Sequence, residues 1–349
     1  MKLRSKVGWM TWLTLTTLPL GQAAFALSAL PDKPPIPAGN PMTPEKVELG
    51  KQLFFDPRLS VDGTLSCNTC HNVMSSGTDN RTVSVGVKGQ LGGRSAPTVW
   101  NAAFLTVQFW DGRAPNLEEQ AKGPMLNPVE MGLTHADMAV QRIGAIPGYR
   151  DQFTQVFGGA QPVTYDNIAK AIAAYERTLI TPNSAFDRFV KGDKNALSAQ
   201  AQQGMRWVKE LGCTGCHSGP NFSGPAEMPI GEGNFQKFPV FTGSVYDTKY
   251  KLRDDLGRYE VTKKAEDINT WRVPTWRNVA LTAPYFHNGS VETLDEAVRV
   301  MAKTQLNLDL NNKQVTAIVA FLNSLTGEFP PQTLPRLPDT PNTTVIGLR

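Results

Sequence analysis

Cysteine and histidine are both scarce in this sequence, which has four of each among its 349 residues. All four cysteines and two of the histidines fall into two copies of one pattern, Cys67-Asn-Thr-Cys70-His71 and Cys213-Thr-Gly-Cys216-His217. Structural disulfides, a redox dithiol or a zinc site would each leave the histidine after both pairs without a role. The few cysteines therefore exclude a disulfide framework as the simplest interpretation.

The spacing of the two patterns has a chemical reason. Two thiols three positions apart can each add to one vinyl group of a haem, and the adjacent histidine can then ligate the iron. The sequence therefore predicts two covalently attached haems of the c type. One would be held by Cys67, Cys70 and His71, and the other by Cys213, Cys216 and His217.

The start of the chain has the composition of an export signal. Lys2, Arg4 and Lys6 precede an apolar stretch from Val7 to about Leu20, and small residues follow near Ala26. A retained membrane anchor is the alternative, but the stretch is shorter than the ~20 residues that a spanning helix needs. We expect residues 1–26 to be a cleaved signal peptide, with the mature protein in the periplasm and not stably inserted in a membrane.

A large excess of charge of one sign is also missing. Cleavage after residue 26 would remove three of the 35 basic residues and none of the 31 acidic ones, which leaves a net charge of about +1. Nucleic acid is therefore not expected as a partner, because binding to phosphates needs a strongly basic surface. Any electrostatic docking must depend on local patches.

Alternating strand patterns are lacking, whereas helical periodicity recurs. Helices are indicated from Thr43 to about Phe54, around 201–208, from Ile168 to Leu179, and from Val315 to Leu325, where Gly327 would end the last one. Gly50 and Gly204 each lie inside a helix that precedes a haem motif. Because glycine costs ~1 kcal/mol in a helix, this weak internal repeat predicts two close helix crossings.

The fold class that follows is mostly α, with two cytochrome c-like haem domains and long irregular loops at 72–115 and 218–280. We expect an N-terminal haem domain at 27–190 and a C-terminal haem domain at 191–349, whose tail packs back on the first domain. The haems would supply part of the apolar core, which allows loops longer than usual.

Both motifs and several other stretches together resemble the bacterial di-haem cytochrome c peroxidases. The stretches are Leu49 to Ser60, Gln108 to Ala114, Asn127 to Met131, and Arg277 to Gly289. The resemblance implies reduction of hydrogen peroxide to water by electrons from a small redox protein, either a cytochrome c or a copper protein. It also implies a homodimer.

In this family the C-terminal haem has His and Met ligands and passes electrons to the peroxidatic N-terminal haem. The resemblance assigns the methionine to Met301, on a helix that follows a capping box formed by Thr293 and Glu296. Leu294, Ala297 and Met301 fall on one face of that helix. Without the resemblance, a methionine on an apolar face would be interpreted as core packing.

The resemblance assigns three residues to the peroxidatic reaction. Glu130 matches the catalytic glutamate, Gln120 its polar neighbour, and Trp110 the tryptophan between the haems. Glu130 would move a proton between the two peroxide oxygens. The alternatives are an exposed loop carboxylate for Glu130 and interface packing for Trp110.

One residue departs from the family pattern. Members that need reductive activation have a distal histidine on the loop after the first motif, and Val87 occupies that position here. Because valine cannot ligate iron, we expect an open N-terminal haem iron that needs little or no activation. Four residues remain as less favoured replacements for the missing ligand, namely His135, Met74, Met131 and Met138. His287 is interpreted as a structural, hydrogen-bonding residue.

The family also binds calcium between its domains. The resemblance assigns backbone carbonyls to Thr282 and Pro284, and Ser95 stands where the family has an asparagine ligand. Calcium takes six to eight oxygen ligands, water included, so a shorter hydroxyl weakens the prediction without excluding it.

Two other functions compete with peroxide reduction. The related methylamine dehydrogenase maturation enzymes use peroxide to oxidise a partner protein, but they have Tyr where this chain has Met301. A plain electron carrier would have two protein ligands on both irons, whereas a sixth ligand for the first iron is not evident in this sequence.

Overall fold

The computed structural model describes residues 27–340 and 344–347, so the expected signal peptide lies outside the described residues. Between residues 27 and 180 the structure has six α-helices: α1 (Pro44–Phe55), α2 (Cys67–Cys70), α3 (Leu117–Leu126), α4 (Ala136–Gly144), α5 (Pro147–Phe157) and α6 (Tyr165–Glu176). The second half contains α7 (Ala185–Val190), α8 (Ala199–Glu210), α9 (Val245–Lys249), α10 (Tyr259–Thr262), α11 (Leu294–Leu306) and α12 (Asn312–Asn323). The prediction of a mostly helical fold is confirmed.

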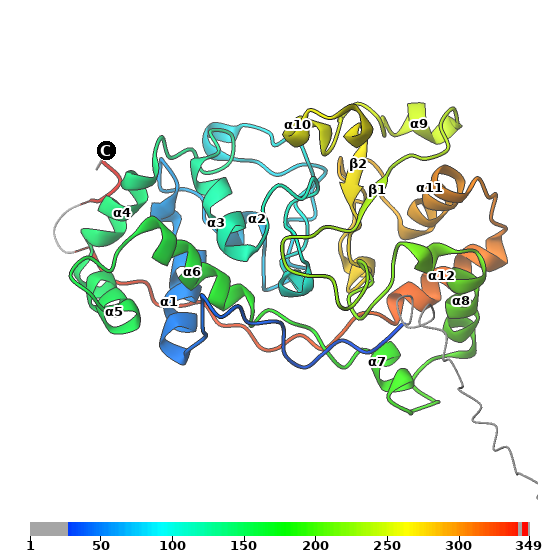
Figure 1. Ribbon diagram of the computed structural model, residues 1–349, viewed down its shortest axis with the longest axis horizontal. Coiled ribbons are helices and arrows are strands. Elements are labelled where there is room, and N and C mark those ends of the chain that lie inside the picture. The colour runs from blue at the N-terminus through cyan, green and yellow to red at the C-terminus, as the bar shows by residue number, and fades with distance from the viewer. Residues whose placement is uncertain (1–26, 341–343, 348–349) are drawn as a thin grey trace, which may run out of the picture.

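A small sheet forms within the segment 218–280 and was not expected from the sequence. Strands β1 (Phe235–Lys237) and β2 (Thr270–Arg272) pair antiparallel, with Phe235 opposite Arg272. Three residues are too short to give a recognisable alternation, so periodicity could not reveal these strands. Figure 1 shows them between the helices of the first half and those of the second.

The internal repeat corresponds to two helix crossings. A Cβ atom at Gly50 of α1 would collide with the carbonyl oxygen of Ala171 in α6, and one at Gly204 of α8 would collide with that of Ala317 in α12. Each glycine therefore permits two backbones to touch, as predicted. Gly327, in contrast, does not end α12, which stops at Asn323; it lies against the Thr181 carbonyl.

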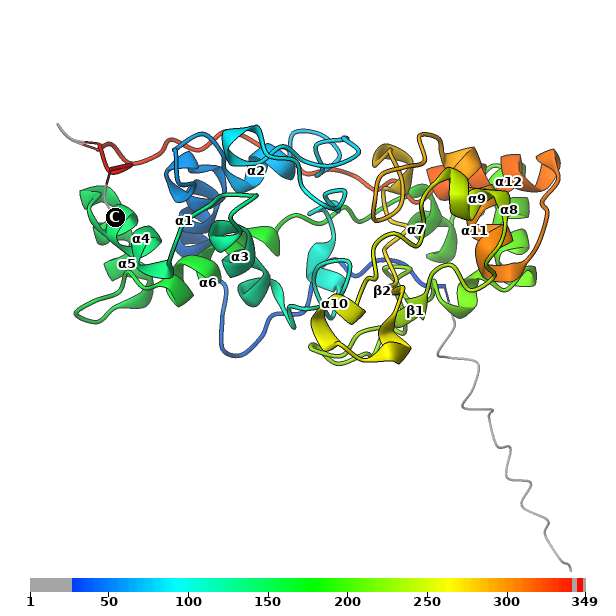
Figure 2. The ribbon, with the colours of Figure 1, turned by 90° about the horizontal axis from the view of Figure 1, so that it is seen from above.

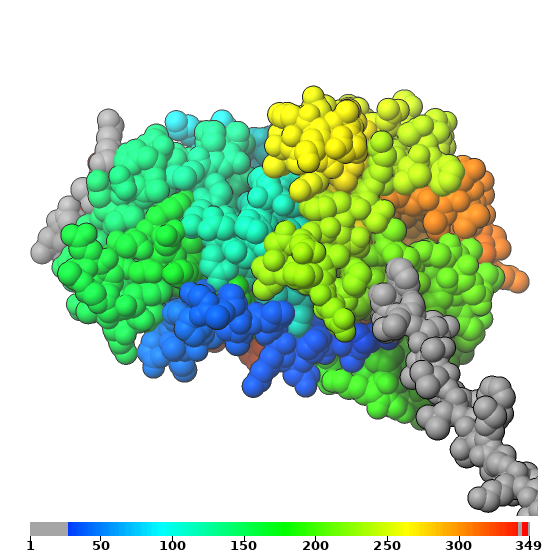
Figure 3. Space-filling model, in the orientation of Figure 1, coloured from blue at the N-terminus to red at the C-terminus, as the bar shows by residue number. Residues whose placement is uncertain are grey.

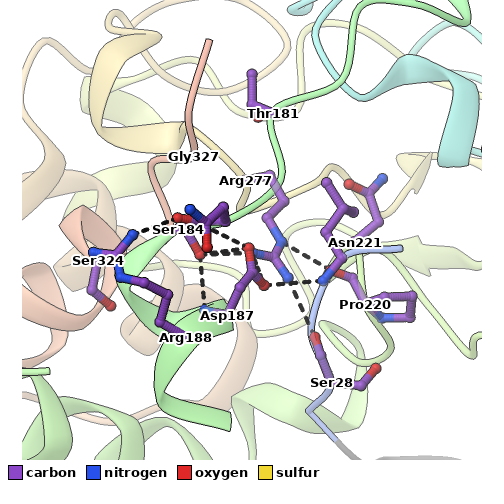
Figure 4. Close-up of polar contacts among 12 residues, drawn as sticks. Ser28, Thr181, Ser184, Asp187, Arg188, Pro220, Asn221, Arg277, Ser324 and Gly327 are labelled. Atoms are coloured by element: carbon purple, nitrogen blue, oxygen red, sulfur yellow. Dashed lines mark hydrogen bonds and ion pairs between the residues drawn. The ribbon is translucent and has the colours of Figure 1, made fainter. Parts of the chain in front are cut away.

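The start of the described chain is fixed to the second half by a buried ion pair (Figure 4). Arg277 and Asp187 are fully buried and 2.8 Å apart. Asp187 Oδ1 accepts a hydrogen bond from Leu30 N at 3.0 Å, while Arg277 Nη2 donates to Ser28 O at 3.3 Å. Arg277 Nε also donates to Pro220 O at 2.9 Å, in the loop after the second haem motif.

The other end of the chain returns to the first half. Arg58 Nη1 donates to Pro338 O at 2.9 Å, and Arg142 Nη2 donates to Ile346 O at 2.7 Å. Figures 1 and 2 show this segment running from α12 past α1 to the far end of the molecule. The segment that begins at residue 27 runs along one edge of both halves in the space-filling view (Figure 3). Both connecting segments therefore tie the two halves together.

In the described part of the chain, no helix has both the length and the apolar character needed to cross a membrane.

Candidate functional site: two adjoining haem cavities

The first motif opens onto a cavity of about 520 Å³ in the N-terminal half. Cys67 and Cys70 are the ends of the one-turn helix α2, and His71 follows directly. The three residues line this cavity. His71 Nδ1 lies 2.9 Å from Pro97 O, and because a carbonyl can only accept, Nδ1 carries the proton. Nε2 is left free for a metal, which is the usual arrangement of a ligating histidine.

The second motif lines a cavity of about 410 Å³ in the C-terminal half. His217 Nδ1 donates to Phe222 O at 3.0 Å, so its Nε2 is also free. Burial lowers the pKa of His217 to about 4, which keeps the imidazole neutral. Phe222 has a positive φ of 53°, an uncommon conformation for a bulky residue that places its carbonyl under His217. Trp276 stacks on the His217 ring.

Met301 lies on the lining of the same cavity as His217. Helix α11 begins after Thr293, whose hydroxyl accepts from Glu296 N at 3.4 Å; the reciprocal half of the expected capping box is not formed. The face predicted from the sequence also lines this cavity, through Leu294, Ala297 and Val298. The arrangement brings a thioether and a neutral imidazole to one site, as His/Met ligation of a haem requires.

Glu130 and Gln120 both line the N-terminal cavity. Gln120 belongs to α3, and Glu130 lies in the turn that follows it, where Glu130 N donates to Asn127 O at 3.1 Å. The side chain of Asn127 in turn donates to Glu130 Oε1 at 2.8 Å. Burial raises the pKa of Glu130, against the opposing effects of Arg113 and Asn127. A carboxyl group of raised pKa that faces a cavity is suited to proton transfer.

Val87 is buried, yet it does not line the N-terminal cavity. Its backbone N donates to Glu130 O at 2.9 Å, and Gly86, next to it, does reach the cavity. Gln90 Nε2 donates to Pro128 O at 3.0 Å, so the loop is fastened along the Glu130 turn. The valine side chain packs toward Gly132 instead of the expected iron site.

The four replacement ligands are dispersed. His135 is exposed before α4, Met74 is exposed, and Met138 accepts a hydrogen bond from the Thr134 hydroxyl. Of these residues, Met131 alone lines the N-terminal cavity. All four histidines are described, and His71 is the one that lines this cavity.

The two cavities share one wall, to which seven residues contribute on both sides: Ser95, Ala96, Pro97, Thr98, Leu105, Trp110 and Arg272. Trp110 Nε1 donates to Ser95 O at 2.9 Å. The same short segment supplies the Pro97 carbonyl that holds His71. A single layer of residues thus separates the two haem cavities, with Trp110 in it.

Ser95, Thr282 and Pro284 all line the C-terminal cavity. Ser95 Oγ donates to Arg81 O at 3.4 Å, and its backbone N donates to His287 O at 2.8 Å. Within the ranges that the structure describes, no group of three His, Cys, Asp or Glu side chains could hold a metal ion. A cation here would depend on carbonyl, hydroxyl and water oxygens.

His287 also lines the C-terminal cavity and stacks on Trp271, with ring centroids 4.0 Å apart. Its buried Nε2 has no hydrogen-bond partner among the described residues, so the expected hydrogen-bonding role of this side chain is not seen there. Its backbone carbonyl alone accepts, from Ser95 N.

Two further cavity residues were missed by the sequence interpretation. Glu176, at the end of α6, lines the N-terminal cavity, and its buried Oε2 has no hydrogen-bond partner within residues 27–340 and 344–347. Burial raises the pKa of Glu176 to about 8. Arg272, at the end of β2, lines both cavities. Glu176 is the last residue of a helix and Arg272 the last residue of a three-residue strand. Neither belongs to a sequence motif that would have identified it as a cavity residue.

Comparison with known proteins agrees with these features. The sequence model of the family described as di-haem cytochrome c peroxidase matches residues 44–195. The cytochrome c551 peroxidase of Nitrosomonas europaea is 45% identical, over 95% of this chain and 96% of that protein. The cytochrome c551 peroxidase of Pseudomonas aeruginosa is 46% identical, over 93% of this chain and 90% of that protein.

More distant relatives include the methylamine utilization protein MauG of Methylorubrum extorquens, which is 34% identical over 88% of this chain and 86% of that protein. Among solved structures, a MauG-like protein associated with microbial copper homeostasis has a TM-score of 0.75 and 29% identity, covering 86% of this chain and 95% of its own. The chain belongs to the di-haem cytochrome c peroxidase family. It is an oxidoreductase that acts on a peroxide and uses haem cofactors.

Proposed function

We propose that this chain is a periplasmic peroxidase that reduces hydrogen peroxide to water with electrons from a small cytochrome c or copper protein. Electrons would enter at a C-terminal haem c ligated by His217 and Met301, and pass to an N-terminal haem c ligated by His71. The observation that carries this proposal is the contrast between the cavities. The C-terminal cavity is lined by a methionine as well as its histidine, whereas the N-terminal cavity is lined by Glu130 and Gln120.

The residues of the N-terminal cavity have separate tasks in the reaction. The haem, when bound, supplies the iron that accepts the peroxide and the electrons. Glu130 takes a proton from one peroxide oxygen and returns it to the departing oxygen, while the Gln120 amide orients the substrate. Two electrons and two protons then convert one hydrogen peroxide to two waters. Val87 leaves the site without a distal histidine, so we infer that prior reduction is not required.

The experiment that tests this function begins with haem content. Protein secreted to the periplasm should contain two haems per chain by the pyridine haemochrome assay, and peroxide should oxidise a reduced cytochrome c or copper protein in its presence. A Cys216→Ala variant, which removes one attachment thiol, is the matched control. A protein with two haems that never oxidises any donor upon addition of peroxide would contradict the proposal.

Trp110 is proposed to shorten the electron path through the wall shared by the two cavities. Trp110→Phe should slow oxidation of the C-terminal haem after peroxide is mixed with half-reduced protein, because it removes the indole and its bond to Ser95. The lost hydrogen bond should cost about 1 kcal/mol of stability. Rapid-mixing absorbance measures the transfer rate. A loss of stability with unchanged transfer would leave Trp110 a packing residue.

Calcium is proposed at the three residues that line the C-terminal cavity together, Ser95, Thr282 and Pro284. With few protein oxygens and no carboxylate among them, binding should be weak. Elemental analysis after dialysis against calcium buffer should give about one ion per chain, and Ser95→Ala should reduce this occupancy. Absence of calcium after that dialysis would remove the site. A homodimer is proposed on the family resemblance, and size-exclusion chromatography with light scattering tests it.

A further inference from the structure

Arg272 occupies an unusual position in the wall between the two haem cavities. It ends β2, its exposed fraction is 4%, and it lines both haem cavities as well as a third cavity of about 340 Å³. Its backbone N donates to Trp110 O at 2.9 Å, which joins it to the wall tryptophan. A buried cation thus lies where three cavities meet.

The guanidinium of Arg272 has only carbonyl partners among the described residues. Nε donates to Phe109 O at 3.0 Å, and Nη1 donates to Val273 O at 3.2 Å. No hydrogen bond is formed by Nη2, and no ion pair by the side chain, within the described part of the chain. Burial lowers the pKa of Arg272 to about 10, so the group is still charged at neutral pH.

The neighbouring carboxylates are already engaged. Asp111 is the carboxylate whose charge acts on Arg272, but it pairs with Arg94 at 2.6 Å and with Arg113 at 2.9 Å. Asp255 pairs with Arg94 at 2.7 Å. The cluster therefore contains three arginines and two aspartates. Because a buried, unpaired charge is destabilising, an anion from outside the polypeptide that enters these cavities would stabilise the guanidinium.

We propose that Arg272 binds the propionate carboxylates of both haems and serves as their shared counter-ion. This inference rests on the proposed attachment of a haem at each motif. A planar guanidinium suits the task, because it can donate two parallel hydrogen bonds to a carboxylate and still present donors in other directions. Its positive charge favours the reduced state of both irons and so raises both midpoint potentials.

Spectroelectrochemical titration of the holoprotein tests the proposal without peroxide or donor. In Arg272→Gln, the equilibrium constant for reduction of each haem should fall by roughly tenfold, as expected for loss of one nearby charge at an effective dielectric constant of about 20. Arg272→Lys keeps the charge and should restore most of both potentials. An unchanged potential at either haem in Arg272→Gln, or equal shifts in the Gln and Lys variants, would overturn the shared counter-ion.

Arg142 provides the matched control. It too is buried on carbonyl oxygens, those of Arg58, Ser60, Val61 and Ile346, but it lines neither haem cavity. Arg142→Gln should lower the melting temperature and leave both potentials unchanged; a shift in both would overturn the specific role of Arg272.

A second measurement covers the case in which Arg272→Gln does not retain both haems. Resonance Raman spectra of Arg272→Lys should then show shifted propionate bending modes for both haems, because the planar fork is lost, and unchanged modes would overturn the proposal. Haem content of the wild type is measured first. A chain without two haems would refute the proposed function itself, whereas a two-haem chain with unaltered potentials would refute only the role of Arg272.

Discussion

Glu130→Gln is expected to lower peroxide turnover by about 10²- to 10⁴-fold while both haems stay attached, because an amide cannot take and return the proton. The Glu130 side chain lines the N-terminal cavity. A glutamine oxygen could still accept the hydrogen bond that Asn127 donates to Glu130 Oε1. Steady-state oxidation of a reduced donor measures the effect. Glu260→Gln is the matched control, since Glu260 is an exposed carboxylate on the same cavity lining that pairs with Lys263. Equal losses in both variants would contradict the role of Glu130.

Glu130 also determines in which direction peroxide turnover should change with pH. Glu130 must be ionised to accept the first proton, and burial raises its pKa from the ordinary value of a glutamate. Activity should therefore fall as the pH decreases through that raised pKa and be retained above it. This acid limb should be missing from the residual activity of Glu130→Gln. An identical acid limb in the variant would assign the titration to another group.

Met301→Leu is expected to have the second large effect, on the C-terminal haem. Leucine keeps the volume of the side chain but removes the sulfur ligand, so the low-spin His/Met signature should disappear and the midpoint potential should fall. Loss of a residue that only hydrogen-bonds to a metal ligand typically lowers activity by roughly 10- to 100-fold. Because Met301 is proposed as a ligand itself, donor-dependent turnover should decrease by at least this factor. Absorbance, redox titration and donor kinetics measure the three changes.

His287 provides the control for Met301, because it lines the same cavity and its Nε2 has no hydrogen-bond partner in the part of the chain that the structure describes. His287→Asn should retain the low-spin signature and the high potential. If this variant lost them and Met301→Leu did not, the sixth ligand would be His287, and the assignment taken from the family resemblance would be wrong.

Local chemistry explains which features could be predicted from the sequence. The haem motifs identify the residues of their cavities, because the cofactor fixes the spacing of the thiols and the histidine. The helices α1 and α12 could be predicted from the helical period of their apolar residues. Gly50 and Gly204 were informative because glycine is unfavourable in a helix unless a second backbone lies close.

Features that depend on distant parts of the chain could not be predicted in this way. Gly327 was taken for a helix end, whereas its real neighbour is Thr181, nearly half the chain away. Arg272 is significant only because Asp111 is already paired with Arg94 and Arg113, a fact of three-dimensional arrangement. The strands β1 and β2 form because two parts of the segment 218–280 meet, not through any pattern within them.

The electron paramagnetic resonance spectrum of the fully oxidised protein tests the central claim most directly. The claim is that the N-terminal iron has an open position, since Val87 packs away from its cavity, while His217 and Met301 both ligate the C-terminal iron. We predict one high-spin signal beside one low-spin signal in the protein as purified. Two low-spin signals would contradict the account, because they would require a sixth ligand on the peroxidatic iron and would favour an activated enzyme or an electron carrier.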